Sequence, residues 1–170
     1  MKYKLTDADG YTRRDKFGET LWVPGVWHEA TGTGVTLCTD GWIHWYDHPL
    51  LAMLFNPINA EIENPRMWEC EIGGEVLLDH GIKGGSKRCR VMREIPVPQI
   101  STEQRITFAV LCTLKVYQSE WSRQWIMKWL SERDRKAVAA WATGVAVTAA
   151  TAKNLDLIAL ACKACGVEHD

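Results

Sequence analysis

Six cysteines are the residues of this 170-residue chain with the most distinctive chemistry. They are Cys38, Cys70, Cys89, Cys112, Cys162 and Cys165. Most of them lie in apolar strings, where a free cysteine behaves as a small buried hydrophobic residue. The first residues contain no apolar segment of the kind that directs secretion, so we expect reduced thiols rather than disulfides.

Cys162 and Cys165 form a Cys-x-x-Cys pair. A redox pair of this type needs its first cysteine at a helix N-terminus, where the helix dipole stabilises the thiolate. Here the pair closes the apolar segment Asn154–Cys165 directly before Gly166, which predicts the C-terminus of a helix. The pattern therefore favours thiols that face a core.

A metal site would have to draw on scattered ligands, namely Cys38, His44, His48, Cys70 and Cys89. A four-ligand zinc site normally shows a closely spaced ligand pair beside another pair, and these residues lack that arrangement. His44 and His48 are expected to span a strand-to-helix turn, because Pro49 follows directly. We predict no metal site and no cofactor.

Five cations lie close together around Gly84-Gly85-Ser86; they are Lys83, Lys87, Arg88, Arg90 and Arg93. A basic hairpin with flanking glycines is able to hold a phosphate or a nucleic acid. The alternative is an edge strand whose charges protect it against aggregation. The segment is not a P-loop, because a strand and not a helix is predicted to follow it.

The elements that position these residues fall into two parts. Glycines and prolines divide residues 1–98 into short strands with one short helix, which predicts a small, mainly antiparallel sheet. The predicted strands are Tyr3–Leu5, Leu21–Val23, Val35–Cys38, Trp42–Tyr46, Met67–Ile72, Glu75–Leu78 and Arg88–Ile95. Gly73-Gly74 is predicted to be a two-residue hairpin turn. The helix is predicted to begin at Asp47, as its N-cap, and to end at Asn56-Pro57.

Residues 99–170 are predicted to form three to four helices. Ser101 and Gln104 offer a capping box for a central buried helix that ends near Tyr117. A second helix would carry Trp121, Trp125 and Trp129 on one face, as core or as a self-association surface. An alanine-rich helix over Lys136–Ala152 and a last helix ending at Cys165 follow. We expect both parts to pack as one α+β unit.

Composition excludes several classes of protein. The chain is 46% hydrophobic and 24% charged, with a formal net charge of −1, so it is neither a basic nucleic-acid coat nor an acidic mimic of DNA. No apolar run reaches the ~18 residues that a membrane span requires. We therefore expect a cytoplasmic protein without a membrane partner.

Three segments resemble an uncharacterised family of small phage and prophage proteins. These segments are Leu37–Leu50, with its Cys-x-x-Gly-Trp turn, Trp68–Val76, which reads WECEIGGEV, and Arg93–Ile95. The family pairs a Cys-x-x-Gly-aromatic turn with a similar hairpin and tends to end in an alanine-rich helix. The resemblance spans most of the chain and implies an origin in a phage or mobile element.

A weaker resemblance links the chain to the ADP-ribosyltransferase fold, through Gly41, Trp42 and Ala52 on a strand and the short helix after it. Those enzymes use NAD and combine an early Arg or His, a middle Ser, Tyr or His, and a late Glu. The resemblance would make His44 the middle residue and Glu120 the late one. No early Arg or His is evident to complete the set. A shared fold alone does not bring an activity.

The leading hypothesis is a protein that binds a host macromolecule, since no other catalytic set appears. Its most concrete form is a phage-encoded inhibitor of a host protein or nucleoprotein complex, such as a defence complex, in the manner of an anti-CRISPR. Exposed tryptophans and arginines dominate such interfaces. The expected contacts are Trp42, Trp45, Lys87, Arg88, Arg90 and Arg93. An NAD-using transferase and nucleic-acid or phosphate binding through residues 83–93 are the alternatives, and the oligomeric state stays open.

Overall fold

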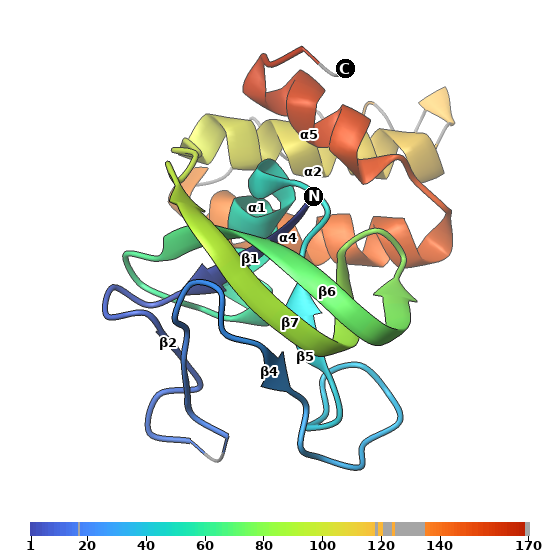
Figure 1. Cartoon of the computed structure of the whole chain (residues 1–170). Helices are drawn as coiled ribbons and strands as arrows, with labels where there is room; N and C mark the ends of the chain where they lie inside the picture. Colours follow the sequence, from blue (N-terminus) through green and yellow to red (C-terminus); the bar gives the residue numbers. More distant parts are fainter. Residues whose placement is uncertain (17, 118, 121–123, 125–134, 169–170) are drawn as a thin grey trace.

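A layer of helices covers one end of an antiparallel sheet, and long loops gather at the opposite end (Figure 1). This computed structural model describes residues 1–16, 18–117, 119–120, 124 and 135–168, with the backbone alone for 135–143. The arrangement confirms the predicted α+β class. The predicted tryptophan helix with Trp121, Trp125 and Trp129 lies outside the described residues.

The main sheet has five antiparallel strands. Its order is β1 (Lys2–Thr6), β6 (Arg66–Asp79), β7 (Lys83–Ile95) and β4 (His28–Glu29), and β5 (Ile43–Trp45) also pairs with β7. The short strands β2 (Tyr11–Thr12) and β3 (Thr20–Leu21) pair with each other. The predicted strand Val35–Cys38 is wrong, because this segment is a loop in which Cys38 adopts a positive φ of 69°.

The central hairpin is longer than predicted, and its turn lies elsewhere. Gly73 and Gly74 are inside β6, at an irregularity in its pairing with β7, where Gly74 has a φ of 75°. The turn comes after Asp79, where His80 and Gly81 both have positive φ and the Ile82 amide donates to the Asp79 carbonyl at 2.7 Å. Consecutive positive φ angles are typical of tight hairpin turns. The glycine pair is therefore a bulge and not the turn.

Strand β1 separates two hydrophobic cores. Leu5 belongs to the larger core, which contains side chains of the helices together with Tyr46 and Met67. The smaller core lies on the other side of the sheet and consists of Trp22, Trp45, Trp68, Cys70, Cys89 and Val91. Because side chains alternate along a strand, Lys4 and Thr6 face this second core, where Thr6 Oγ1 accepts a hydrogen bond from Trp68 Nε1 at 3.0 Å.

Helix α1 (Pro49–Asn59) contributes five buried residues to the larger core. Its N-cap is His48, whose side chain accepts from the Leu50 amide, and not Asp47 as predicted. Asp47 instead forms an ion pair with Lys2. The helix also continues through Pro57, which was predicted to end it.

The remaining helices follow the predicted boundaries closely; they are α2 (Thr102–Val116), α4 (Arg135–Ala152) and α5 (Leu157–Cys165). The Ser101–Gln104 capping box is present, and Gly166 ends α5 in the left-handed conformation. Helix α2 is buried on one face only, through Phe108, Ala109, Cys112 and Thr113, so it is not the fully buried helix that was predicted. No helix within the described ranges is long and apolar enough to cross a membrane.

Candidate functional site

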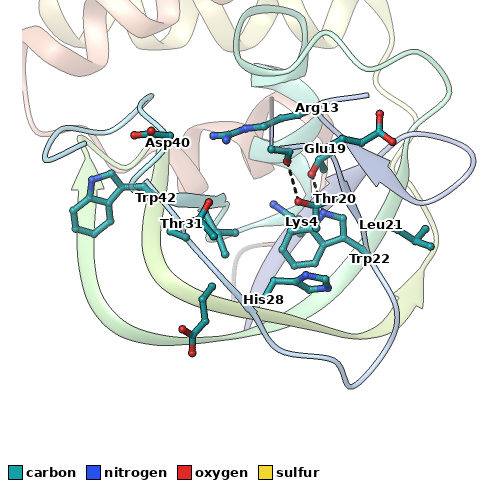
Figure 2. A pocket seen from close by; sticks show the side chains of 15 residues that line it. Lys4, Arg13, Glu19, Thr20, Leu21, Trp22, His28, Thr31, Asp40 and Trp42 are labelled. Carbon is teal, nitrogen blue, oxygen red and sulfur yellow. Dashed lines mark hydrogen bonds between the residues drawn. The ribbon is translucent and has the colours of Figure 1, made fainter. Parts of the chain in front are cut away.

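A cavity of about 400 Å³ lies among the loops that connect β1 to β5. Figure 2 shows Lys4, Trp22 and His28 on one side, Asp40 and Trp42 on the other, and Arg13 between them. Lys4 comes from β1 and His28 from β4, two strands of the main sheet. Arg13 comes from the loop between β2 and β3, where it has a positive φ of 56°.

Lys4 is the most unusual residue of this cavity, because it is a lysine with only 6% of its surface exposed. Its Nζ donates to the His44 carbonyl at 3.0 Å and lies 4.3 Å from the centre of the Trp22 ring. Burial lowers the pKa of the Lys4 ammonium, because a low-dielectric surrounding disfavours charge. No carboxylate in the described part of the chain forms an ion pair with it.

His28 and Trp22 form the aromatic wall of the cavity, with ring centres 4.5 Å apart. Trp22 Nε1 donates to Thr12 Oγ1 at 2.8 Å, which fixes the indole against the β2–β3 pair. His28 Nε2 is buried and has no hydrogen-bond partner among the described residues. Burial, together with the nearby Lys4, lowers the pKa of His28, so its imidazole is neutral at pH 7.

Three carboxylates lie around the cavity, and each already has a partner. Glu19 Oε2 accepts from the Asp15 amide at 2.6 Å, and Asp40 Oδ1 accepts from the Gly34 amide at 3.2 Å. Glu29 forms an ion pair with Arg88 at 3.2 Å. These acids therefore hold the loops and the sheet edge in place, and none of them neutralises Lys4.

Two buried thiols lie on the sheet near Lys4. Cys70 and Cys89 belong to the smaller core, and both are free. The Cys70 thiol donates a hydrogen bond to Cys89, and this bond together with burial raises the pKa of Cys70, which keeps the thiol protonated. The same hydrogen bond and the nearby Lys4 lower the pKa of Cys89, so the Cys89 sulfur is the described group of this core that can offset part of the lysine charge.

A second feature, which we call the Trp27 cluster, lies on the outer face of the sheet. It consists of Trp27, Arg88 and Arg90, and both guanidinium groups lie 4.8 Å from the centre of the half-buried Trp27 ring. The same ring lies over Gly73 of β6. Arg90 also donates to Glu71 at 2.6 Å, and Arg88 pairs with Glu29. Arg93, three residues further along β7, donates to Glu69 at 2.7 Å.

Both tryptophans that were predicted to make contacts are buried, which corrects the expectation that they are exposed. Trp42 is 3% exposed and Trp45 is 0% exposed. The glycines next to Lys83 explain why, since a Cβ on Gly84 would come within 2.2 Å of the Trp45 ring. A Cβ on Gly85 would come within 3.1 Å of Trp42 Cβ. The lack of side chains at Gly84 and Gly85 thus leaves room for the two indole rings. The buried rings offer no surface to a macromolecular partner.

Lys83 and Lys87 are also engaged with the protein. Lys83 is buried and donates to Cys38 Sγ at 3.0 Å and to Asn59 Oδ1 at 3.3 Å. Lys87 donates to the Gly41 carbonyl at 2.9 Å, with its ammonium 3.8 Å from the centre of the Trp42 ring. Both lysines therefore bind neighbouring parts of the protein. The alternative of an edge strand protected by charge is wrong, because β7 pairs with β6 and also with β4 and β5.

The structure does not bring His44 and Glu120 into the cavity. His44 Nε2 accepts from the Cys38 amide at 3.1 Å, and burial lowers its pKa to about 3, so the ring is neutral. Glu120 is exposed and accepts from the Gln124 side chain. The Cys162–Cys165 pair ends α5 with Cys162 buried, as predicted. The described residues contain no group of three or more possible metal ligands.

Sequence reasoning missed Lys4, Arg13, His28 and Trp27. One signal was present, since Lys2, Lys4 and Thr6 alternate with Tyr3 and Leu5, which places the polar residues on one face of a strand. The sequence near these residues does not show that other parts of the protein bury this face of the strand. A scan against models of protein families, a search of curated proteins and a search of solved structures found no match to this chain.

Proposed function

We propose that the protein is a phage-encoded binding protein that attaches to a host protein or nucleoprotein complex in the host cytoplasm and inhibits it. The observation that carries the proposal is the Trp27 cluster, in which two guanidinium groups frame one half-buried indole. Tryptophan and arginine are the residues that most often dominate the energy of protein interfaces. Arg88 and Arg90, which the sequence favoured as contacts, thereby keep this role.

Exposed apolar residues continue the cluster along the chain. Val23 and Val26 are 45% and 47% exposed, and they belong to the same loop as Trp27. An apolar centre with a rim of charged pairs is the usual composition of a specific protein interface. The ion pairs with Glu29 and Glu71 favour a protein over a nucleic acid, because phosphates would have to displace these carboxylates.

The experiment is affinity capture of the tagged full-length protein from bacterial lysates, including strains that express defence complexes. The variants are Trp27→Ala and the double substitution Arg88→Glu/Arg90→Glu. Leu78→Ala is the matched control, because Leu78 is an exposed apolar residue on the same hairpin, outside the cluster. Urea unfolding of each variant verifies that it is folded.

A stoichiometric protein that the wild type and Leu78→Ala retain at high salt, and that both cluster variants lose, is the expected result. Retention by the cluster variants would refute the assignment of the surface. A partner that nuclease treatment removes, and that is lost steeply with salt, would replace the proposal by nucleic-acid binding. NAD turnover that depends on His44 and Glu120 would replace it by the transferase alternative.

A further inference from the structure

The cavity beside Lys4 holds a buried cation that forms no ion pair with a carboxylate of the described residues. Lys4 Nζ uses one hydrogen bond, to the His44 carbonyl, although an ammonium has three N–H groups. Leaving buried donors without acceptors is costly, so such a group calls for an explanation. The cavity supplies such an explanation, because the Lys4 side chain lines it.

The surrounding donors converge on the same space. Arg13 also lines the cavity and forms no ion pair with the described residues, although Asp7, Asp9 and Glu19 all lie in or near its loop. His28 Nε2 is buried without a partner, and the hydroxyl groups of Thr20 and Thr31 complete the lining. These groups suit a small anion with two acceptor oxygens.

We propose that this cavity is a binding site for a carboxylate group, with the Lys4 ammonium as its buried cation and Arg13 at its mouth. A bound carboxylate would accept hydrogen bonds from the Lys4 ammonium, and charge-assisted hydrogen bonds of this kind are the strong ones. Trp22 and the threonines would contact the rest of the ligand. This site and the Trp27 cluster use different cations, and Glu29, which lines the cavity and pairs with Arg88, lies between them.

A carboxylate fits the charges better than a phosphate. Glu19, Glu29 and Asp40 line the cavity, and each of them repels a second negative charge on the ligand. One buried ammonium balances a monoanion, whereas a phosphate dianion would keep a net charge in a partly desolvated place. The volume of about 400 Å³ lies at the small end of ligand sites, which favours a small acid or a single acidic side chain.

The test is a titration of the isotope-labelled full-length protein, followed by amide NMR shifts and calorimetry. The probe is N-acetylglycine, with the neutral N-acetylglycinamide and inorganic phosphate as comparisons. Saturable shifts at Lys4, Trp22, His28 and Thr31, from the carboxylate alone, are the expected result. Binding of the amide with equal affinity, tighter binding of phosphate, or no shift at these amides would overturn the proposal.

Variants connect the binding to the named cations. Lys4→Met should weaken N-acetylglycine binding at least 10-fold, and Arg13→Asn several-fold, since asparagine tolerates the positive φ at this position. Lys16→Met, an exposed lysine of the same loop, should bind like the wild type. If Lys4→Met fails to fold, Arg13→Asn still tests the proposal. Unchanged N-acetylglycine binding in Arg13→Asn would overturn it.

The carboxylate has two possible sources, a free small acid or an acidic side chain of the protein partner. Displacement of the captured partner by N-acetylglycine assigns the carboxylate to the partner, and simultaneous binding assigns it to a free acid. Failure here is distinct from failure of the proposed function. A partner lost with Trp27→Ala but no carboxylate binding would refute only the site, and the reverse result would refute only the proposed function.

Discussion

The guanidinium of Arg105 donates to the carbonyl of Met53 at 2.9 Å, which is the carbonyl that Pro57 leaves without its helical partner. In an α-helix the amide of residue 57 would donate to residue 53, and proline has no amide hydrogen. Arg105 belongs to α2, so a side chain from one helix supplies the hydrogen bond that another helix lacks. This contact explains why α1 continues to Asn59.

Replacing Arg105 with methionine should therefore destabilise the protein by about 1–3 kcal/mol, the cost of an unpaired buried acceptor. Pro57→Ala should restore most of this loss in the Arg105→Met background, because alanine supplies the missing amide. Urea unfolding of the wild type, both single variants and the double variant measures the coupling. Strictly additive effects would show that the two residues do not act on one carbonyl.

Gly84→Ala should be among the most damaging single substitutions in the sheet. Its Cβ would lie 2.2 Å from the fully buried Trp45 ring, so either the ring or the strand must move. We expect a loss of about 3 kcal/mol or more, at the upper end for overpacking. Thermal unfolding measures the effect.

Gly73→Ala is the matched control for this prediction, because its Cβ would meet no described atom closer than 3.6 Å. It should change the free energy of unfolding by less than about 1 kcal/mol. Trp45→Phe should recover part of the stability of Gly84→Ala, since phenylalanine is smaller than the indole. Equal losses at Gly73 and Gly84 would contradict the role assigned to the glycine.

Lys4 should make the stability of the protein depend on pH. Its pKa is lowered in the folded state from an ordinary value of 10.5, so the unfolded chain binds more protons between these two values. Stability should therefore rise as the pH rises through this window, and it should be lower below it. Lys4→Met should remove this slope and stabilise the protein by about 1–3 kcal/mol at pH 7, because no buried donor is left unpaired.

Urea unfolding from pH 7 to pH 9.5, with wild type and Lys4→Met compared at each pH, isolates the lysine. His28, His44, Arg13, Cys70 and Cys89 are the titratable or charged groups that act on Lys4 or respond to it, and they are present in both proteins. Their own titration contributes in both, and the difference reports mainly Lys4. Parallel curves for the two proteins would contradict the prediction.

The thiols should separate into fast and slow groups when the native protein is alkylated. Cys38 is exposed, whereas Cys70, Cys89, Cys112 and Cys162 are buried. Burial also raises the pKa of Cys112 to about 12, so its reactive thiolate is scarce at neutral pH. Iodoacetamide with mass spectrometry should modify Cys38 at least 10-fold faster than these four.

Cys38→Ser is the control, since it should remove the fast phase and leave the slow one unchanged. Denaturation with urea should make all the remaining cysteines react at similar rates. A buried cysteine that reacts as fast as Cys38 in the folded protein would show that the core around it opens readily.

The sequence predicted the helices far better than the hairpin turn, and the reason is physical. Ser101 with Gln104 and Gly166 act within one turn of helix, so local sequence suffices for them. The hairpin turn depends on which residues of β6 and β7 pair, and Gly73-Gly74 is a local turn signal that long-range register overrides. Arg105 on Met53 is likewise invisible until two helices are packed together.

The candidate site was harder to predict than the fold. Its residues come from β1, from the loop after β2 and from β4, and only the closed sheet brings them together. Trp42 and Trp45 were predicted to be contacts and proved to be core, whereas Trp27 lies between two arginines. Arg88 and Arg90 were predicted as contacts because a cluster of charges is visible in the local sequence. Their partners Glu29 and Glu71 were not predicted, because they are distant in the sequence.

Strand β1 carries a consequence for the order in which the protein assembles during translation. It leaves the ribosome before β6, its hydrogen-bonded partner, and Thr6 contacts Trp68 across 62 residues of chain. Until β6 emerges, Leu5 has no partner strand, and Lys4 stays in water at no electrostatic cost. Lys4 therefore loses its contact with water only when β6 and β7 have been synthesised. A ribosome that slows between residues 6 and 66 would prolong the time in which chaperones and proteases can bind the unfolded segment.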